Sequence, residues 1–280
     1  DTIGPMARSV YDVALVLETI AGHDPKDSTS RAEPVPRYTS ILKRTKNLRG
    51  LRIGIPSEYF VEALDSAVDF SLRSAIEQIE SLGAEVLEVS LPHTRYAIPV
   101  YYLLLFAEAS SNLAKYDGIR FGLSERNVDS LMELYLKTRE NGFGAETKRR
   151  IMLGTFALSA GYYDAYYLKA QKVRTLIRQD FQKAFEACDA LITPVAPGTA
   201  FRIGEKITNP LDMYLSDVFV VAVNLAGIPA LSVPCGISNG LPIGMQIMGP
   251  HLSEETLLQI GHMYQSETDW HKKHPPCWND

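Results

Sequence analysis

The feature that most constrains the fold is a strand–helix–strand pattern between residues 51 and 91. Residues 51–56 read LRIGIP and residues 84–91 read AEVLEVSL, two short apolar runs that are typical of β-strands. Between them, residues 66–82 form a helical pattern whose apolar side chains share one face, namely Val68, Leu72, Ile76, Ile79 and Leu82. Strands joined through a helix form a β-α-β unit, so the pattern predicts an α/β protein.

Helix and strand patterns alternate along the rest of the chain as well. Amphipathic spacing predicts a helix over 9–20, ended by Gly22, and further helices over 98–115, 127–140, 146–159, 161–187 and 254–267. Three more strands are expected over 190–195, 230–235 and 242–249, and Asn239-Gly240 between the last two is typical of a hairpin turn. Strands interleaved with helices, without a repeat or a linker, predict one layered α/β domain over residues 1–280.

The charge balance limits the partners that the chain can have. Its 280 residues include 28 Lys and Arg against 33 Asp and Glu, a net charge of −5, so no general positive field draws it onto nucleic acid. Any RNA contact must therefore be local. Residues 31–49 contain six Lys or Arg and a single acid, Glu33. We interpret this segment as a solvated surface connection, with an RNA-facing segment as the alternative.

Three further features bear on the cellular setting. No apolar run reaches the roughly 18 residues that a membrane-spanning helix needs, and the longest, over 97–107, is followed by Glu108. The three cysteines lie far apart, which is typical of a reducing compartment, so we expect the cytoplasm or an organellar matrix. The chain begins at Asp1 without an initiator Met or a signal-peptide pattern, and we expect it to be a piece of a longer protein.

General catalytic motifs are scarce in this sequence. Neither a Gly-rich phosphate loop nor a His-Glu-x-x-His motif is present. Ser40 and Lys43 match the Ser-x-x-Lys pattern in which a lysine activates a serine, but the companion motifs are missing. His271, His274 and Cys277 have a spacing that three zinc ligands could use, although no fourth ligand is near. We interpret the first set as a chance match and the second as a solvated terminus.

Several blocks of sequence form a set that general patterns do not explain. They are DTIGPMAR (1–8), AGHDPKDS (21–28), EASSNL (108–113), YDGIRFG (116–122), KRRIMLGT (148–155), GYYDAYY (161–167) and VNLAGIPA (223–230). Together they resemble the A subunits of the amidotransferases that act on glutamyl-tRNA(Gln) and aspartyl-tRNA(Asn), a group within the amidase signature family. The resemblance follows the family's order from Asp1 to about His271.

The resemblance implies both a fold and a reaction. The fold is an α/β/α sandwich around a mixed β-sheet, of which this chain holds the C-terminal portion and lacks the N-terminal part. The reaction is that of a glutaminase: a serine attacks the side-chain amide of glutamine, ammonia leaves and water releases glutamate. The serine, the cis-configured serine and the lysine of this triad would lie upstream of Asp1, so no catalytic residue is assigned in this chain.

The resemblance also implies three residues of the substrate pocket: Tyr101, Arg150 and Asp217. Glutamine is a zwitterion, so its selection needs a cation for the α-carboxylate and an anion for the α-ammonium group. Arg150 would bind the carboxylate, Asp217 the ammonium group, and the Tyr101 hydroxyl would add a hydrogen bond. Tyr102 and Arg149 are the neighbouring alternatives. Without the resemblance, each residue has an ordinary explanation as a helix-start charge, an N-cap or a core side chain.

The implied partners are those of the family. A B subunit would receive the ammonia through a channel and use it on an ATP-activated acyl-tRNA, and a C subunit would wrap around the pair. ATP and magnesium would belong to the B subunit, which would also hold most of the misacylated tRNA, and we expect no cofactor in this chain. Two alternatives stay open: a stand-alone amidase of the same family, and a non-catalytic binding or assembly module.

Overall fold

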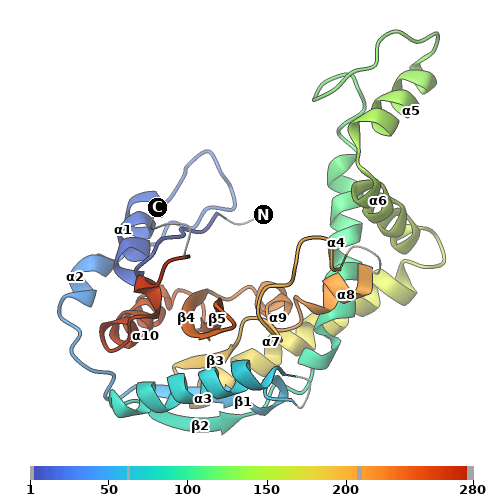
Figure 1. Ribbon diagram of the computed structural model, residues 1–280. Coiled ribbons are helices and arrows are strands. Elements are labelled where there is room, and N and C mark those ends of the chain that lie inside the picture. The colour runs from blue at the N-terminus through green and yellow to red at the C-terminus, as the bar shows by residue number, and fades with distance from the viewer. Residues whose placement is uncertain (1–2, 62–63, 207–209, 276–280) are drawn as a thin grey trace. The chain divides into compact units, whose positions relative to one another are not determined.

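The structure of this protein is a computed structural model that describes residues 3–61, 64–206 and 210–275 (Figure 1). The chain forms two compact units. Unit 1 comprises Asp1–Arg95 with Ile177–Asp280, and unit 2 comprises Tyr96–Leu176. We describe each unit by itself. The expected assignment of residues 1–280 to the C-terminal portion of a single amidase domain stays a prediction.

Unit 1 is built on a mixed five-stranded sheet with the order β2-β1-β3-β5-β4. The strands are β1 (Arg52–Pro56), β2 (Glu85–Val89), β3 (Ala190–Pro194), β4 (Ala230–Ser238) and β5 (Leu241–Met248). Strand β1 runs parallel to β2 and β3, whereas β5 runs antiparallel to β3 and β4. The sheet confirms the predicted α/β class and the predicted β-α-β unit.

The hairpin between β4 and β5 is also confirmed, and its turn shows why Asn-Gly favours this connection. Asn239 has a φ of 51° and Gly240 a φ of 77°, both in the left-handed region. Successive positive φ angles match the twist of the two strands, and asparagine and glycine adopt them at the least cost. The connection is therefore determined locally, and β5 then continues into the middle of the sheet.

The core of unit 1 lies around β3, whose five residues are all buried. Helix α3 (Ser66–Ser81) packs on the sheet and buries Val68, Leu72, Ala75 and Ile79. Val68, Leu72 and Ile79 are on the predicted face, whereas the predicted Ile76 is half-buried and Leu82 is the C-cap. The helix begins at Asp65, whose carboxylate accepts a hydrogen bond from the Ala67 N–H at 2.8 Å. Helix α10 (Glu254–Ser266) also contacts the sheet and is buried on several turns.

The remaining helices of unit 1 are α1 (Val10–Ile20), α2 (Tyr38–Leu42), α8 (Pro210–Leu215) and α9 (Val221–Ala226). Helix α1 is confirmed where the apolar spacing predicts it, and it packs on α2 and α10. The sequence patterns did not predict α2, α8 or α9. Each has five or six residues, which is too short to show a helical period.

Unit 2 consists of helices: α4 (Ala97–Leu113), α5 (Leu131–Gly142) and α6 (Ala145–Leu158). A π-helical turn over Asp164–Leu168 leads into α7 (Lys169–Ala187), which begins in unit 2 and ends in unit 1. One continuous helix over 161–187 was predicted, so the π-helical turn is a correction. None of the helices in the described part of the chain combines the length and the apolar character needed to cross a membrane.

Candidate functional site

Tyr101 and Tyr102 lie side by side on α4 but face different surroundings. Tyr102 is 9% exposed and its ring lies 5.5 Å from that of Phe106, so it belongs to the core of unit 2. The ring of Tyr101 is half-buried and meets Tyr102 edge to face, with centroids 5.2 Å apart. Burial therefore favours Tyr101 over Tyr102 as the tyrosine that can contact a ligand.

Arg150 on α6 is tied to a neighbour one helical turn away. Its Nε donates to Glu146 Oε1 at 2.9 Å, and the other oxygen of the same carboxylate accepts from Arg149 Nη1. Glu146 lies in the first turn of α6, where the helix dipole favours a negative charge. A bond to Nε fixes the plane of a guanidinium group, because that group is rigid and planar. Glu146 was not singled out from the sequence, although its spacing from Arg150 is a signal that could have found it.

The helices that carry Tyr101 and Arg150 pack closely on each other within unit 2. Gly154 makes this possible, because a Cβ atom at that position would overlap the carbonyl oxygen of Phe106 and lie 2.7 Å from the Ser110 Cβ. The hydroxyls of Ser110 and Thr155 add a hydrogen bond at 2.9 Å across the same contact. The glycine thus sets the distance between the two helices.

Asp217 belongs to unit 1 and lies in the turn between α8 and α9. Its backbone N–H donates to the Tyr214 carbonyl at 3.2 Å, and its own carbonyl accepts from the Val220 N–H at 3.0 Å. The side chain is half-buried. The structure thus brings the helices of Tyr101 and Arg150 together in unit 2 and holds Asp217 in a hydrogen-bonded turn of unit 1.

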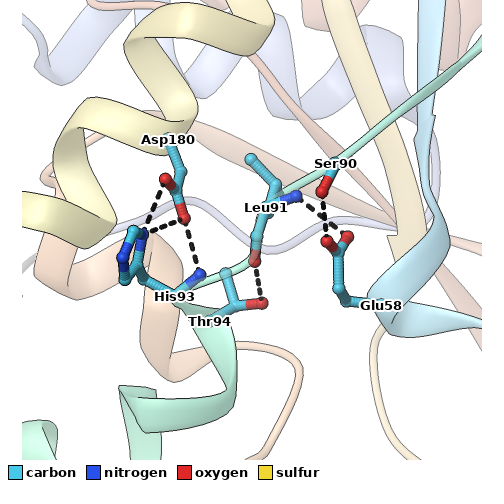
Figure 2. A network of polar contacts seen from close by, with 6 residues as sticks. All are labelled: Glu58, Ser90, Leu91, His93, Thr94 and Asp180. Carbon is cyan, nitrogen blue, oxygen red and sulfur yellow. Dashed lines mark hydrogen bonds and ion pairs between the residues drawn. The ribbon is translucent and has the colours of Figure 1, made fainter.

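A polar network that the sequence patterns did not predict fixes the segment after β2 (Figure 2). Glu58 accepts hydrogen bonds from the Ser90 hydroxyl at 2.5 Å and from the Leu91 N–H at 2.9 Å. The Thr94 hydroxyl donates to the Leu91 carbonyl at 2.7 Å. Burial alone would raise the pKa of Glu58, but the bonds from Leu91 and Ser90 hold that pKa below its usual value.

The second half of this network joins the same segment to α7. Asp180 accepts from the His93 N–H at 2.7 Å and from His93 Nδ1 at 2.9 Å, as Figure 2 shows. The Asp180 side chain is only 11% exposed, so both bonds are shielded from water. These residues are 87 positions apart in the chain, and no local pattern could have paired them. We assign the pair a structural role.

The other candidate sites from the sequence do not assemble into catalytic geometry among the described residues. Ser40 and Lys43 are both exposed, no hydrogen bond described for either side chain joins them, and Lys43 Nζ lies 5.7 Å from the Tyr11 ring centroid. For the candidate zinc ligands, His274 Nδ1 lies 2.7 Å from Arg8 Nη1, and Cys277 is outside the described residues.

The described ranges also contain neither a candidate metal site nor an exposed cysteine thiol. These residues contain no group of three His, Cys, Asp or Glu that could hold a metal ion. Cys188 and Cys235 are buried, and burial raises the pKa of Cys188 to about 11 and that of Cys235 to about 12. Both thiols are therefore protonated and unreactive near neutral pH.

Comparison with known proteins places the sequence and the fold of this chain in one family of enzymes. The sequence profile of the amidase family matches residues 1–258, and the chain belongs to this family. It is 58% identical over 274 residues to the A subunit of glutamyl-tRNA(Gln) amidotransferase from Geotalea daltonii, covering 98% of this chain and 56% of that protein. The same protein from Sulfurihydrogenibium sp. is 54% identical over 275 residues, with the same coverage.

Solved structures give the same family. The crystal structure of the A subunit of glutamyl-tRNA(Gln) amidotransferase from Thermotoga maritima superimposes with a TM-score of 0.75 at 37% identity, covering 95% of this chain and 53% of that one. The chain therefore spans about half the length of the relatives that it matches. The predicted resemblance to amidotransferase A subunits is confirmed.

Proposed function

We propose that this chain is part of the glutamine-hydrolysing A subunit of a tRNA-dependent amidotransferase and carries its amino-acid pocket. The observation that carries the proposal is the identity of 58% to an A subunit of glutamyl-tRNA(Gln) amidotransferase, over 98% of this chain. The compartment proposed is the bacterial cytoplasm or an organellar matrix.

The proposed pocket recognises the two charged ends of glutamine. Arg150 binds the α-carboxylate, Asp217 binds the α-ammonium group, and the Tyr101 hydroxyl donates or accepts one further bond. The bond from Arg150 Nε to Glu146 supports this role, because it orients the guanidinium group before the substrate arrives. A neutral amide would gain nothing from this charge pair.

In the proposed reaction, a serine upstream of Asp1 attacks the side-chain amide carbon of glutamine. The carbon–nitrogen bond breaks, ammonia leaves, and water then hydrolyses the glutamyl ester to glutamate. The ammonia passes to a B subunit, where ATP and magnesium activate the misacylated tRNA, and a C subunit completes the assembly. This chain holds glutamine, and the chemistry on tRNA takes place in its partner.

The test is a transamidation assay with two nitrogen sources. A complete subunit containing residues 1–280 is combined with its B and C partners, ATP, magnesium and misacylated tRNA. With glutamine, wild type should form amidated tRNA and Arg150→Ala should be strongly impaired. With ammonium chloride in place of glutamine, the two proteins should be equally active, because ammonia bypasses the pocket.

Two outcomes would contradict the proposal. One is wild-type hydrolysis of simple amides with no glutamine-dependent amidation of tRNA, which would indicate a stand-alone amidase. The other is an equal loss of both activities in Arg150→Ala, which would place Arg150 in the fold or in the assembly rather than in the glutamine pocket.

A further inference from the structure

Positive charge is concentrated in one segment of an acidic chain. Between Glu33 and Glu58 there is no Asp or Glu, but there are six Lys or Arg: Arg37, Lys43, Arg44, Lys46, Arg49 and Arg52. The other 22 of the 28 basic residues share the rest of the chain with all 33 acids. A local field of this kind acts at short range even when the whole protein is negative.

Five of these six side chains are exposed and take part in no ion pair described for unit 1. Arg52 is not counted among the five, because its Nη2 donates to Asp189 Oδ1 at 3.2 Å. The other five, Arg37, Lys43, Arg44, Lys46 and Arg49, are exposed and lie directly before and after α2 in the chain. We call them the α2 basic surface.

The backbone beneath these charges is anchored. Tyr38, Leu42 and Leu48 are buried at 6%, 1% and 1% exposure, and the Leu48 N–H donates to the Leu82 carbonyl at 2.9 Å. The stem of Arg49 packs against Gly83, where a Cβ atom would lie 2.7 Å from the Arg49 Cγ. The cations are therefore presented by a fixed segment.

Four acids near this segment can be named: Glu18, Glu254 and Glu255 act on α2, and Glu85 donates its backbone N–H to the Leu51 carbonyl. Glu18 accepts from the Thr39 N–H at 3.1 Å, and burial together with Glu254, Glu255 and Glu18 raises the pKa of Tyr38. These carboxylates weaken the field close to Arg37. The cations after α2, namely Lys43, Arg44, Lys46 and Arg49, are therefore the ones that the test removes.

The segment that carries the α2 basic surface exposes charge rather than apolar side chains. No large apolar side chain is exposed between Ile20 and Val61 among the described residues. Protein interfaces are centred on apolar and aromatic side chains and are depleted in lysine, whereas phosphate backbones are held mainly by Lys, Arg and other polar groups. No exposed aromatic ring is available in this described segment to stack on a base, so contact would be independent of sequence.

We infer that the α2 basic surface binds the phosphate backbone of an RNA. The choice of RNA among polyanions rests on the proposed function, in which a tRNA is brought to the assembly. Through this surface the chain would contact the backbone of the tRNA that the partner subunit holds, and the contact would help to position that tRNA.

The test is equilibrium binding of fluorescently labelled tRNA to the 280-residue chain, between about 50 and 200 mM salt. The quadruple variant K43Q/R44Q/K46Q/R49Q should bind tRNA at least about tenfold more weakly at low salt. The slope of the logarithm of the binding constant against the logarithm of the salt concentration should be smaller in magnitude by roughly 3, since each phosphate contact contributes about 0.7 to 0.9 to that slope. The double variants K43Q/R44Q and K46Q/R49Q should each show about half of that change in slope. Circular dichroism verifies that the exposed substitutions leave the fold unchanged.

A matched control removes four charges elsewhere. K169Q/K172Q/R178Q/K183Q changes exposed residues of α7 and gives the same net charge, so it should bind tRNA like wild type. Loss of binding in this control equal to that in the quadruple variant would overturn the inference, as would unchanged binding in the quadruple variant. Binding of polyglutamate as tight as that of tRNA would overturn it too, because it would indicate an acidic protein partner. None of these readouts depends on glutamine hydrolysis, so failure here leaves the proposed function standing.

Discussion

Glu146 is the residue through which the α6 helix orients Arg150. Glu146→Gln removes the charge but keeps an acceptor oxygen, so the bond from Arg150 Nε should weaken and the plane of the guanidinium group should be held less firmly. We expect the KM for glutamine in a complete subunit to rise about 2- to 10-fold with kcat nearly unchanged, since partly exposed ion pairs are worth on the order of 1 kcal/mol or less. The measurement is steady-state ammonia release.

Arg149 supplies the control for this prediction, because it shares the same carboxylate without a proposed ligand role. Arg149→Ala should leave the KM within about twofold of wild type, as expected for an exposed side chain. A fall in kcat at constant KM in Glu146→Gln would show that Glu146 acts elsewhere.

Glu58 predicts how stability depends on pH. The pKa of Glu58 is lowered in the folded protein. The ionised carboxylate therefore adds to the free energy of unfolding above the ordinary glutamate pKa, and this stabilisation is lost as the pH falls through the pKa of the folded state. The melting temperature of wild type should therefore drop from about pH 5 downward, and Glu58→Gln should show a smaller drop because it has nothing to protonate.

Thermal melts at several pH values test this prediction. Glu77→Gln is the control, since Glu77 is exposed on α3 and has no hydrogen bond described in the structure. An equal pH dependence in wild type and Glu58→Gln would show that the network in Figure 2 does not contribute to acid stability.

Gly154 governs the packing of α4 on α6. Gly154→Ala should destabilise unit 2 by about 1 to 3 kcal/mol or more, because the added methyl group overlaps the Phe106 carbonyl, which is backbone and cannot rotate away. Urea unfolding measures the change in the free energy of unfolding. Gly144→Ala is the matched control at the start of α6, with no atom within 4 Å of its added Cβ. Similar stability of both variants would mean that the helices separate at little cost.

The elements predicted from sequence are those with a clear period or a strong turn signal. Helix α3 buries Val68, Leu72 and Ile79 of the predicted face, and the Asn239-Gly240 turn joins the predicted strands. The π-helical turn over Asp164–Leu168 lies within an uninterrupted helical pattern, so no residue marks it in the sequence. Helix α5 begins at Leu131, later than the expected residue 127, because the Ser130 hydroxyl accepts from the Glu133 N–H at 3.2 Å and caps the helix there.

The candidate site was predictable only in part. The resemblance implies Tyr101, Arg150 and Asp217, whose ligand roles stay a prediction, and burial favours Tyr101 over Tyr102. The pairing of His93 with Asp180 depends on tertiary packing across 87 positions of the chain, which no local pattern encodes.

For the whole molecule, about half the length of its relatives is covered by this chain. If the catalytic serine and lysine lie upstream of Asp1, the 280-residue chain alone should release no ammonia from glutamine. A coupled ammonia assay checks this expectation. Turnover that is abolished by Ser40→Ala would contradict it and would bring Ser40 and Lys43 forward as catalytic residues.

The recognition of glutamine by its charged ends is the property on which the proposed function depends, and a comparison of two substrates decides it. In a complete subunit, kcat/KM is measured for glutamine and for butyramide, which has no α-carboxylate or α-ammonium group, in wild type and Arg150→Ala. A charged contact that becomes buried when the substrate binds is worth roughly 2 to 5 kcal/mol, so the value for glutamine should fall on the order of 30-fold to several thousandfold while the value for butyramide stays nearly constant. Arg150→Lys should recover only part of the loss, because an ammonium group cannot reproduce the planar fork. Equal losses on both substrates would contradict glutamine recognition by Arg150, which would then support the fold or the nucleophile rather than bind the carboxylate.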